Sequence, residues 1–291
     1  MADFLQLLLS GLATGAIYAL AALGFTLLWQ ASGTINFAQG EFVMVPAFLM
    51  LAFSSLGLPL LLSFACTCVV AVFLLGWVFK RGLIDRLIRF GMMPVVVATL
   101  GLSIALRNGI RAGYSAEAQP FPSLFADKLY NVAGVTVTLA DVGTLLLALL
   151  LVLGTQAFLS RTVTGRAMQA VAQNTDSATV LGINVPRMVL YTFAINALLA
   201  CAAALLVTPT YLAKFDMGEG LSTKAFFAAI IGGFNNSRGA LLGGLIVGVA
   251  ENLAAAYISS AYKDAVALVI FMTVILFKPQ GLLGKTIERK V

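Results

Sequence analysis

The stretch FLQLLLSGLATGAIYALAALGFTLLWQASGTINFAQG (Phe4–Gly40) contains no charged residue. A helix crosses a lipid bilayer with about 20 consecutive apolar residues, and no soluble core needs a charge-free run of this length. A second charge-free run extends from Phe42 to Phe79. Of the 291 residues, 60% are hydrophobic and 10% are charged. The sequence therefore predicts an all-α, polytopic membrane protein.

Apolar runs of this kind predict about eight transmembrane helices and one short, broken element. The eight are Phe4–Trp29, Asn36–Ala52, Leu60–Phe79, Pro94–Arg111, Leu139–Ser160, Met188–Ala213, Ala240–Tyr257 and Ala265–Phe277. The ninth element, Ala225–Phe234, is too short to cross alone, because Gly and Asn residues break it. We expect a surface loop over Ala112–Thr138. Soluble linkers are nearly absent, so we expect a single transmembrane domain over residues 1–291.

Basic residues indicate the orientation, because they favour the cytoplasmic side of a membrane. Eleven of the eighteen Lys and Arg residues fall in three segments that would share one side. They are Lys80, Arg81, Arg86, Arg89, Arg161, Arg166, Arg187, Lys278, Lys285, Arg289 and Lys290. This bias predicts a multi-pass membrane protein with the N-terminus outside and the C-terminus in the cytoplasm.

Two polar clusters interrupt the apolar pattern: Gly33–Glu41 (GTINFAQGE) and Gly232–Gly239 (GGFNNSRG). Both contain Asn-x-x-x-Gly and run directly into an apolar helix, which suggests an inverted repeat with broken helices of the kind found in transporters. Irregular backbone at membrane depth must be buried in protein or face a water-filled cavity. The alternative is that both clusters are turns at the membrane surface.

Two acidic residues, Glu41 and Glu251, begin or lie within apolar helices. A carboxylate in the bilayer costs at least ~2.5 kcal/mol, so such a group usually faces a cavity or a partner. Glu41 also suits the first turn of a helix, where a negative charge is favourable. Arg107 receives no role from the sequence. Glycine pairs spaced by four, as in Gly11–Gly15 and Gly244–Gly248, predict close helix packing within the chain.

The segment Thr164–Gly182 (TGRAMQAVAQNTDSATVLG) is polar and helix-patterned between two apolar spans. Gly182 can end a helix in the left-handed conformation, and Pro186 prevents its continuation. A short helix at the cytoplasmic membrane surface is suited to docking a soluble partner. The alternative is an ordinary interfacial loop helix.

Several function classes are excluded by what the sequence lacks. The chain contains no histidine, which excludes histidine acid–base chemistry and histidine metal sites. It has no phosphate-binding loop of the G-x-x-x-x-G-K-[ST] type, so it does not itself hydrolyse ATP. We find no catalytic constellation, metal site or cofactor site. The net charge of +6 is accounted for by membrane topology, and nucleic-acid binding has no support.

Three groups of segments together resemble the permeases of bacterial ABC importers for branched-chain amino acids, most closely the shorter member of the paired permeases. They are Gly11–Leu20 with Ile35–Glu41; Gly165–Ala167 with Ala172–Asn174 and Leu181–Asn184; and Ala229–Phe234 with Arg238–Ala240, Gly243, Gly244, Glu251 and Lys278–Gly284. The likeness covers essentially the whole chain in order. Gln39 stands where histidine is common in the family, which removes a titratable role there.

The resemblance implies a translocation subunit that is not an enzyme. It would work in the lipid bilayer of a bacterial cytoplasmic membrane, with a second homologous permease, two cytoplasmic ATPase subunits and an extracytoplasmic solute-binding protein. The polar segment would then be the coupling helix for the ATPase. Related systems carry branched-chain amino acids, and others carry urea, amides or carboxylates.

A secondary transporter could use the same broken helices, but it would not need a docking helix. A membrane-embedded assembly subunit would need neither the polar clusters nor buried acids.

Three sets of residues follow as candidates. The translocation path is predicted to include Asn36, Gln39, Asn235 and Asn236, because amides exchange hydrogen bonds with a solute without holding it tightly. Helix-break support is assigned to Gly40, Glu41, Gly232, Gly233, Gly239 and Glu251. ATPase coupling is assigned to Gly165, Arg166, Ala167, Ala172, Asn174, Asp176 and Gly182.

Overall fold

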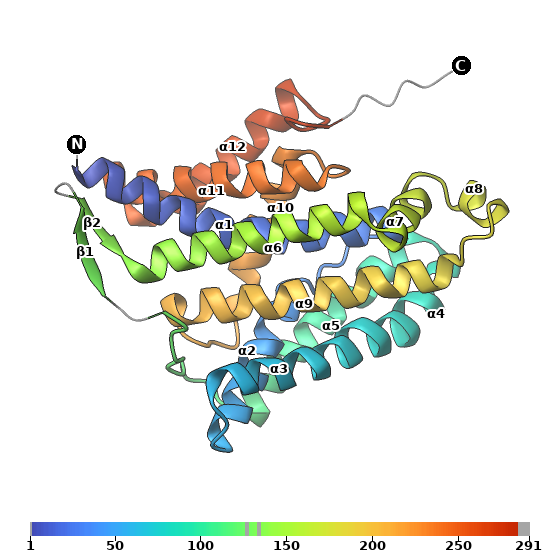
Figure 1. Cartoon of the computed structure of the whole chain (residues 1–291), viewed down its shortest axis with the longest axis horizontal. Coiled ribbons are helices and arrows are strands. Elements are labelled where there is room, and N and C mark those ends of the chain that lie inside the picture. The colour runs from blue at the N-terminus through green and yellow to red at the C-terminus, as the bar shows by residue number, and fades with distance from the viewer. Residues whose placement is uncertain (1, 126–127, 133–134, 285–291) are drawn as a thin grey trace. The chain divides into compact units, whose positions relative to one another are not determined.

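The computed structural model describes residues 2–125, 128–132 and 135–284, and almost all of its regular structure is helical (Figure 1). In chain order the elements are α1 (Ala2–Ser32), α2 (Glu41–Ser55), α3 (Leu60–Ala71), η1 (Val72–Val78), η2 (Lys80–Ile84), α4 (Asp85–Leu87), η3 (Ile88–Phe90), α5 (Met92–Gly113), β1 (Leu129–Val132), β2 (Val135–Thr138), α6 (Leu139–Arg161), α7 (Val163–Gln173), α8 (Thr175–Val180), α9 (Val185–Tyr211), α10 (Met217–Gly232), α11 (Ser237–Tyr257), η4 (Ser260–Tyr262) and α12 (Lys263–Phe277). Lys285, Arg289 and Lys290, which the basic bias predicts to be cytoplasmic, lie outside the described residues.

Within these described ranges, seven helices are long and apolar enough to cross a membrane, judged by length and composition. They are Ala2–Ser32, Leu60–Phe90, Met92–Gly113, Leu139–Arg161, Val185–Tyr211, Ser237–Tyr257 and Ser260–Phe277. The polytopic all-α prediction is confirmed, but the prediction of a full span over Asn36–Ala52 is wrong. Its helix, α2, begins only at Glu41 and has 15 residues, fewer than a bilayer requires.

The predicted half-length element also differs from its expected bounds. It belongs to α10, a helix of 16 residues that begins at Met217. Glu219 and Lys224 are therefore helical residues. The expected surface loop over Ala112–Thr138 contains the antiparallel hairpin of β1 and β2, in which Leu129 pairs with Thr138. The β-branched run VTVT (Val135–Thr138) favours a strand, and this signal was missed.

The chain divides into two compact units. Unit 1 consists of Met1–Thr26, Phe125–Val152 and Lys224–Val291, and unit 2 consists of Leu27–Leu124 and Leu153–Thr223, as far as these ranges are described. Three of the four divisions fall inside α1, α6 and α10, and the fourth, between Leu124 and Phe125, falls in the segment between α5 and β1.

Unit 1 is held together by close packing of α1 against α11. A Cβ added to Gly15 would lie 2.8 Å from the carbonyl oxygen of Gly244, and one added to Gly244 would lie 2.5 Å from the backbone nitrogen of Ala19. Gly11 in turn faces Val249 and Gly248. The early part of α1 thus lies against the later part of α11, so these helices are antiparallel. The prediction that the glycine pairs serve packing within the chain is confirmed.

In unit 2, α2 packs against α5, α9 and the long helix Leu60–Phe90. The rings of Phe42 and Phe79 meet edge to face, 4.8 Å between centroids, and Phe79 also contacts Phe193. Phe42 and Phe193 are fully buried, as expected for large apolar side chains between helices. A second cluster of Met44, Val45, Phe48 and Ala213 packs against α5 residues. The short helix α2 is therefore surrounded by protein.

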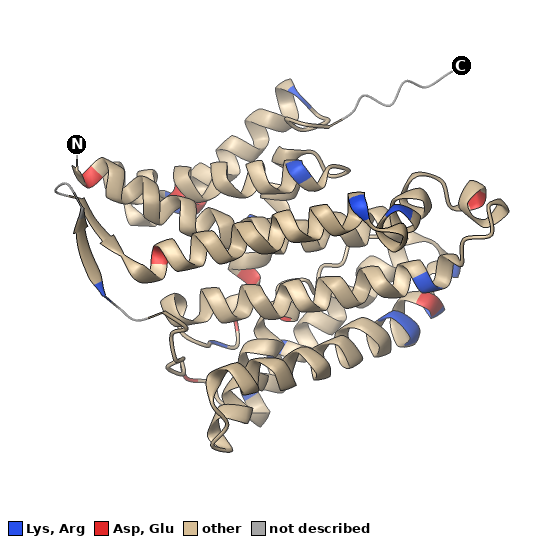
Figure 2. Ribbon diagram, viewed as in Figure 1, with Lys and Arg blue, Asp and Glu red and all other residues tan. Residues whose placement is uncertain are grey.

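Charged residues are concentrated near helix ends, and few lie in the middle of the long helices (Figure 2). Within unit 2, the basic residues of α4, of α7 and of the first turn of α9 lie at the same end, at the right of the view. This is the grouping that the three basic segments predict for those parts of the chain.

We predict that Gly248→Ala destabilises the protein, whereas Gly101→Ala does not. A Cβ at position 248 would overlap the backbone of Gly15, while one at position 101 meets nothing within 4 Å. Overpacking typically costs about 1–3 kcal/mol, and alanine is otherwise the better helix former. Thermal unfolding of both variants in detergent provides the measurement. Equal melting temperatures for the two would contradict the α1–α11 packing.

Candidate functional site

The first polar cluster is the break between α1 and α2. Gly33 adopts a positive φ of 63°, which turns the chain out of α1. The side-chain oxygen of Asn36 accepts a hydrogen bond from the backbone N–H of Ala38 at 3.0 Å, and the backbone N–H of Phe37 donates to the hydroxyl of Thr99 at 3.3 Å. Asn36 is buried, and among the described residues its side-chain nitrogen has no hydrogen-bond partner.

The side chain of Gln39 is hydrogen-bonded to the side-chain amide of Asn196, a residue that the sequence did not point to. Its Nε2 donates to Oδ1 of Asn196 at 2.8 Å, and Nδ2 of Asn196 donates back to Oε1 of Gln39 at 3.1 Å. Both side chains are buried. A reciprocal amide pair satisfies much of the hydrogen-bonding capacity of two groups that would be costly to bury alone. In this conformation Gln39 therefore ties the break to α9.

The α1–α2 break meets the start of α10 through two glycines. A Cβ added to Gly218 would lie 2.6 Å from the carbonyl carbon of Gly40, and a Cβ on Gly40 would overlap the Gly218 carbonyl. Neither position has room for a side chain. We call the meeting of Gly40 and Glu41 with Gly218 and Glu219 the half-helix junction, because both short helices begin there.

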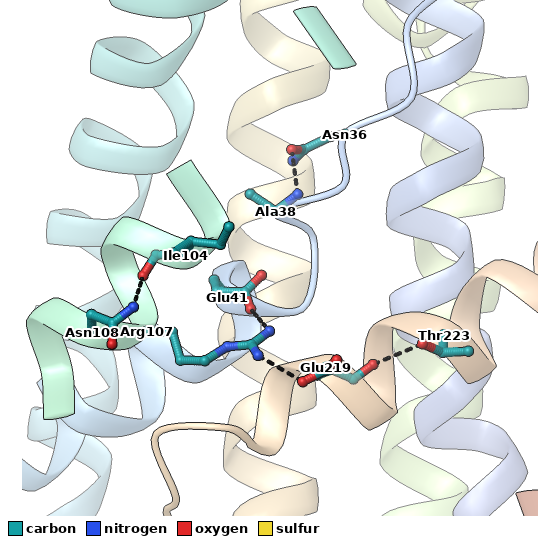
Figure 3. A network of polar contacts seen from close by, with 8 residues as sticks. All are labelled: Asn36, Ala38, Glu41, Ile104, Arg107, Asn108, Glu219 and Thr223. Carbon is teal, nitrogen blue, oxygen red and sulfur yellow. Dashed lines mark hydrogen bonds and ion pairs between the residues drawn. The ribbon is translucent and has the colours of Figure 1, made fainter. Parts of the chain in front are cut away.

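Arg107 of α5 joins the two acidic residues of the half-helix junction (Figure 3). Its Nη2 lies 3.2 Å from Oε1 of Glu41, and its Nη1 lies 2.6 Å from Oε2 of Glu219. The Glu41 side chain is 2% exposed, that of Arg107 25% and that of Glu219 65%. Each carboxylate also stands in the first turn of its helix, where the backbone dipole favours negative charge. The bridge thus pairs one buried and one exposed carboxylate.

The second polar cluster, Gly232–Gly239, forms the tight turn between α10 and α11. Gly233 has a φ of 106°, and Gly232 and Gly239 are in close backbone contact. Asn236 caps α11 by accepting from the backbone N–H of Arg238 at 2.9 Å, and its Nδ2 donates to the carbonyl of Leu283 at 3.0 Å. Asn235 is exposed. The two predicted path pairs, Asn36 with Gln39 and Asn235 with Asn236, belong to different units.

Glu251 lies in the interior of unit 1, as the sequence led us to expect. It is 3% exposed. Its Oε1 lies 2.6 Å from Nζ of Lys224 and 3.6 Å from Nζ of Lys263, and its Oε2 accepts from the hydroxyl of Tyr18 at 2.8 Å. Lys224 also pairs with Asp264 at 3.0 Å. This network connects α1, α10, α11 and the start of α12 through one buried carboxylate.

The polar segment Thr164–Gly182 is two helices rather than the single one expected. Asn174 leaves the helical conformation after α7, and its side chain caps α8 by accepting from the N–H of Ser177 at 2.8 Å. An internal Asn can compete in this way for backbone hydrogen bonds, which explains the break. Gly182 ends the segment with a φ of 79°, as predicted.

The faces of α7 and α8 differ in burial. Gly165 fits tightly against the backbone of Phe158 and Leu159 at the end of α6, and Met168, Val171 and Ala178 are buried. Ala167 and Ala172 are half-buried, while Arg166 and Asp176 are exposed. Three apolar side chains are strongly exposed: Val163 (77%), Val180 (87%) and Leu181 (76%).

The sequence did not point to Arg107, Asn196, Glu219 or Lys224 as site residues. One signal could have found Glu219. Phe37–Glu41 (FAQGE) and Phe215–Glu219 (FDMGE) share Phe-x-x-Gly-Glu, and each opens a short helix. The spacing Asn-x-x-x-Gly pairs the first cluster with Gly232–Gly239, whereas the structure joins Gly40 to Gly218.

Comparison with known proteins identifies relatives over the whole chain. Residues 7–275 match the family model described as branched-chain amino acid transport system / permease component. The chain is 33% identical to the high-affinity branched-chain amino acid transport system permease protein BraD of Pseudomonas aeruginosa, over 99% of this chain and 98% of the relative. It is 31% identical to the corresponding protein LivH of Escherichia coli K12 over the same shares. No solved structure matches the chain.

A more distant likeness extends to another kind of permease. The ribose import permease protein RbsC of Haemophilus influenzae is 26% identical over 89% of this chain and 81% of its own length.

We predict that Glu251→Gln destabilises the protein far more than Asp264→Asn. The first change leaves Lys224 and Lys263 without their buried counter-charge, and breaking a buried ion pair costs about 3–5 kcal/mol. Asp264 is 71% exposed, and exposed ion pairs contribute about 0–1 kcal/mol. Adding Lys224→Gln to Glu251→Gln should recover part of the loss. Melting temperatures in detergent test this, and equal losses for the two single variants would contradict it.

Proposed function

The chain belongs to the family of permease components of branched-chain amino acid transport systems, and on that premise we propose that it forms the membrane pathway of an ATP-driven importer for branched-chain amino acids. The observation that carries the proposal is the match to BraD and LivH over 99% of this chain. The seven long apolar helices of the described chain suit a multi-pass protein of a cytoplasmic membrane, and its sequence contains no phosphate-binding loop.

We infer the partners from this role. The sequence has no ATP-hydrolysing motif, so two separate cytoplasmic ATPase subunits would supply the energy. A second homologous permease would complete the pathway, and an extracytoplasmic solute-binding protein would deliver the amino acid. The chain would act as one permease domain, an inference supported by the three unit divisions that fall within helices α1, α6 and α10.

We propose that the polar segment Thr164–Gly182 docks on an ATPase subunit. Its support is an unusual distribution of apolar side chains on a polar element. Val163, Val180 and Leu181 are exposed. Exposed apolar side chains on a polar element are stabilised when a partner buries them, so they indicate a docking surface. The caps at Thr162 and Asn174 and the close fit of Gly165 against α6 stiffen the segment. A stiff segment attached to α6 can transmit a displacement to the membrane helices.

We propose that the two polar clusters lie on or beside the translocation path, with Asn36, Gln39, Asn235 and Asn236 facing or bracing it. The support is the broken-helix arrangement, since discontinuous helices in transporters surround their substrate sites. Gly40, Glu41, Gly232, Gly233, Gly239 and Glu251 would maintain the breaks. Their close contacts and buried ion pairs support that assignment.

We propose an outside N-terminus and a cytoplasmic C-terminus. The support comes from unit 1, in which α1 and α11 are antiparallel. The segment after α12 hydrogen-bonds to the end of α10, just before the turn into α11: the backbone N–H groups of Leu282 and Leu283 donate to the carbonyls of Ile231 and Gly232. The end of the described chain and the beginning of α1 therefore lie at opposite ends of this unit, and the basic bias selects which end is cytoplasmic.

Reconstitution with the partner permease, the ATPase subunits and the binding protein should give ATP-dependent uptake of L-leucine into proteoliposomes. Leu181→Glu should reduce ATPase co-purification and uptake strongly, because it places a charge on an apolar docking face. Leu56→Glu is the matched control, since Leu56 is equally exposed at 76% but lies in the α2–α3 turn. Normal coupling in Leu181→Glu would identify the segment as an ordinary surface helix.

Single cysteines on either side of α12, at Ala261 in η4 and at Lys278, should test the orientation. In a background with Cys66, Cys68 and Cys201 replaced by serine, a membrane-impermeant thiol reagent should label Ala261→Cys in intact cells. It should label Lys278→Cys only after permeabilisation. Both positions are exposed in the structure. The reverse pattern would overturn the proposed topology.

A further inference from the structure

The two halves of the Glu41–Arg107–Glu219 bridge differ in their contact with solvent. Glu41 is almost completely buried beside Arg107, whereas 65% of the Glu219 side chain is exposed. A buried charge pair is costly to separate, while an exposed pair contributes little to stability. The Glu41–Arg107 contact is therefore the fixed half of the bridge, and the Arg107–Glu219 contact is the half that can exchange.

We propose that Arg107 and Glu219 bind the two charged groups of a zwitterionic amino acid as it passes the half-helix junction. Arg107 binds the carboxylate, and Glu219 binds the ammonium group. Glu41 is a positioning residue that holds Arg107 in place. The inference rests on the proposed importer function and assigns its cargo contacts to residues outside the amide clusters.

The chemistry of the pair matches a zwitterion. Nη1 of Arg107 and Oε2 of Glu219 are 2.6 Å apart, so a basic and an acidic group already face each other. An amino acid carries the complementary carboxylate and ammonium groups on one carbon atom. When it enters between the two side chains, one internal ion pair is replaced by two ion pairs with the cargo. A guanidinium is well suited to this step, because its planar donors bind carboxylates in a fixed geometry.

Other small solutes fit the junction less well. Urea or a neutral amide carries no charge that could replace either member of the ion pair. A simple carboxylate would satisfy Arg107 but would face Glu41 and Glu219 without a second positive group. The charges of the junction are otherwise balanced: the two carboxylates are offset by one guanidinium and by two helix N-termini of about half an elementary charge each. A cargo with a net charge would disturb this balance, and among cargoes without net charge only one that carries both signs can replace both members of the ion pair.

The sequence repeat supports a functional pairing at this point. Each Phe-x-x-Gly-Glu segment ends an irregular stretch and opens a half-length helix, and the glycines bring the two helix starts into contact. Discontinuous helices in transporters present their ends to the substrate. The irregular backbone on both sides of the junction is tolerated in an apolar chain where it is buried or lines a cavity. Arg107 also retains a buried Nε without a hydrogen-bond partner among the described residues.

The test uses the complete importer in proteoliposomes with saturating leucine-loaded binding protein. Glu219→Gln should lower the maximal rate of ATP-driven L-leucine uptake about tenfold or more, as expected for loss of a charge-assisted contact. Glu219→Asp keeps the charge and should restore much of the rate. The concentration of binding protein that gives half the maximal rate should stay unchanged. Asp216→Asn changes an exposed acid three residues earlier, just before α10. It is the matched control and should stay within about twofold of the unaltered importer.

Four results would overturn the inference. One is unchanged uptake in Glu219→Gln. A second is an equal loss in Glu219→Gln and Glu219→Asp together with lower complex yield and melting temperature, which would make Glu219 a structural clamp. A third is ATP-independent leakage of leucine through Glu219→Gln with pumping intact, which would make the pair a seal. Finally, if the unaltered importer does not transport leucine, the proposed function itself fails before any variant is compared.

Discussion

The starts of α2 and α10 can meet only because both residues at the contact are glycine. Gly40 and Gly218 leave no room for a Cβ on either side, so any other residue would separate the two backbones. This contact brings Glu41 and Glu219 within reach of a single arginine. Without that arginine, a carboxylate as deeply buried as Glu41 would have no counter-charge, and the short helix α2 would begin with an unpaired charge inside an apolar protein.

Both units use the same two devices. In unit 1, glycines allow α1 and α11 to touch through their backbones, and Glu251 gathers two lysines and a tyrosine around one buried carboxylate. Close backbone contact supplies packing where lipid provides no hydrophobic driving force between helices. A charged side chain inside an apolar protein is stable only beside its counter-charge. Each buried ion pair therefore fixes the relative positions of the helices that carry its two members. Small residues and paired charges therefore set helix placement in both units, together with the packing of large apolar side chains such as Phe42 and Phe193.

The sequence predicted these features to different extents. The apolar runs predicted the long helices well, because length and hydropathy are local properties. The glycine spacing predicted close packing, and the interior position of Glu251 was also predicted. The partners were not: Arg107 and Glu219 are more than a hundred residues apart, and only the fold joins them. The false full span over Asn36–Ala52 arose because Asn36 and Gln39 are uncharged, so the break is barely visible to a count of charges. Asn174 misled in a similar way, since its capping role depends on a local conformation that a helical pattern does not reveal.

The two Phe-x-x-Gly-Glu segments show how one repeated motif can acquire two roles. The sequence gives both glutamates the same place in the first turn of a short helix, yet their surroundings differ: Glu41 is enclosed by protein, and Glu219 remains largely exposed. Burial makes the Glu41–Arg107 contact permanent, and exposure makes the Glu219–Arg107 contact replaceable. A path residue in an importer must release its cargo, so a contact that water can compete for is more useful there than a desolvated one. The asymmetry between two copies of the same motif is thus what allows a rigid bridge to include an exchangeable site.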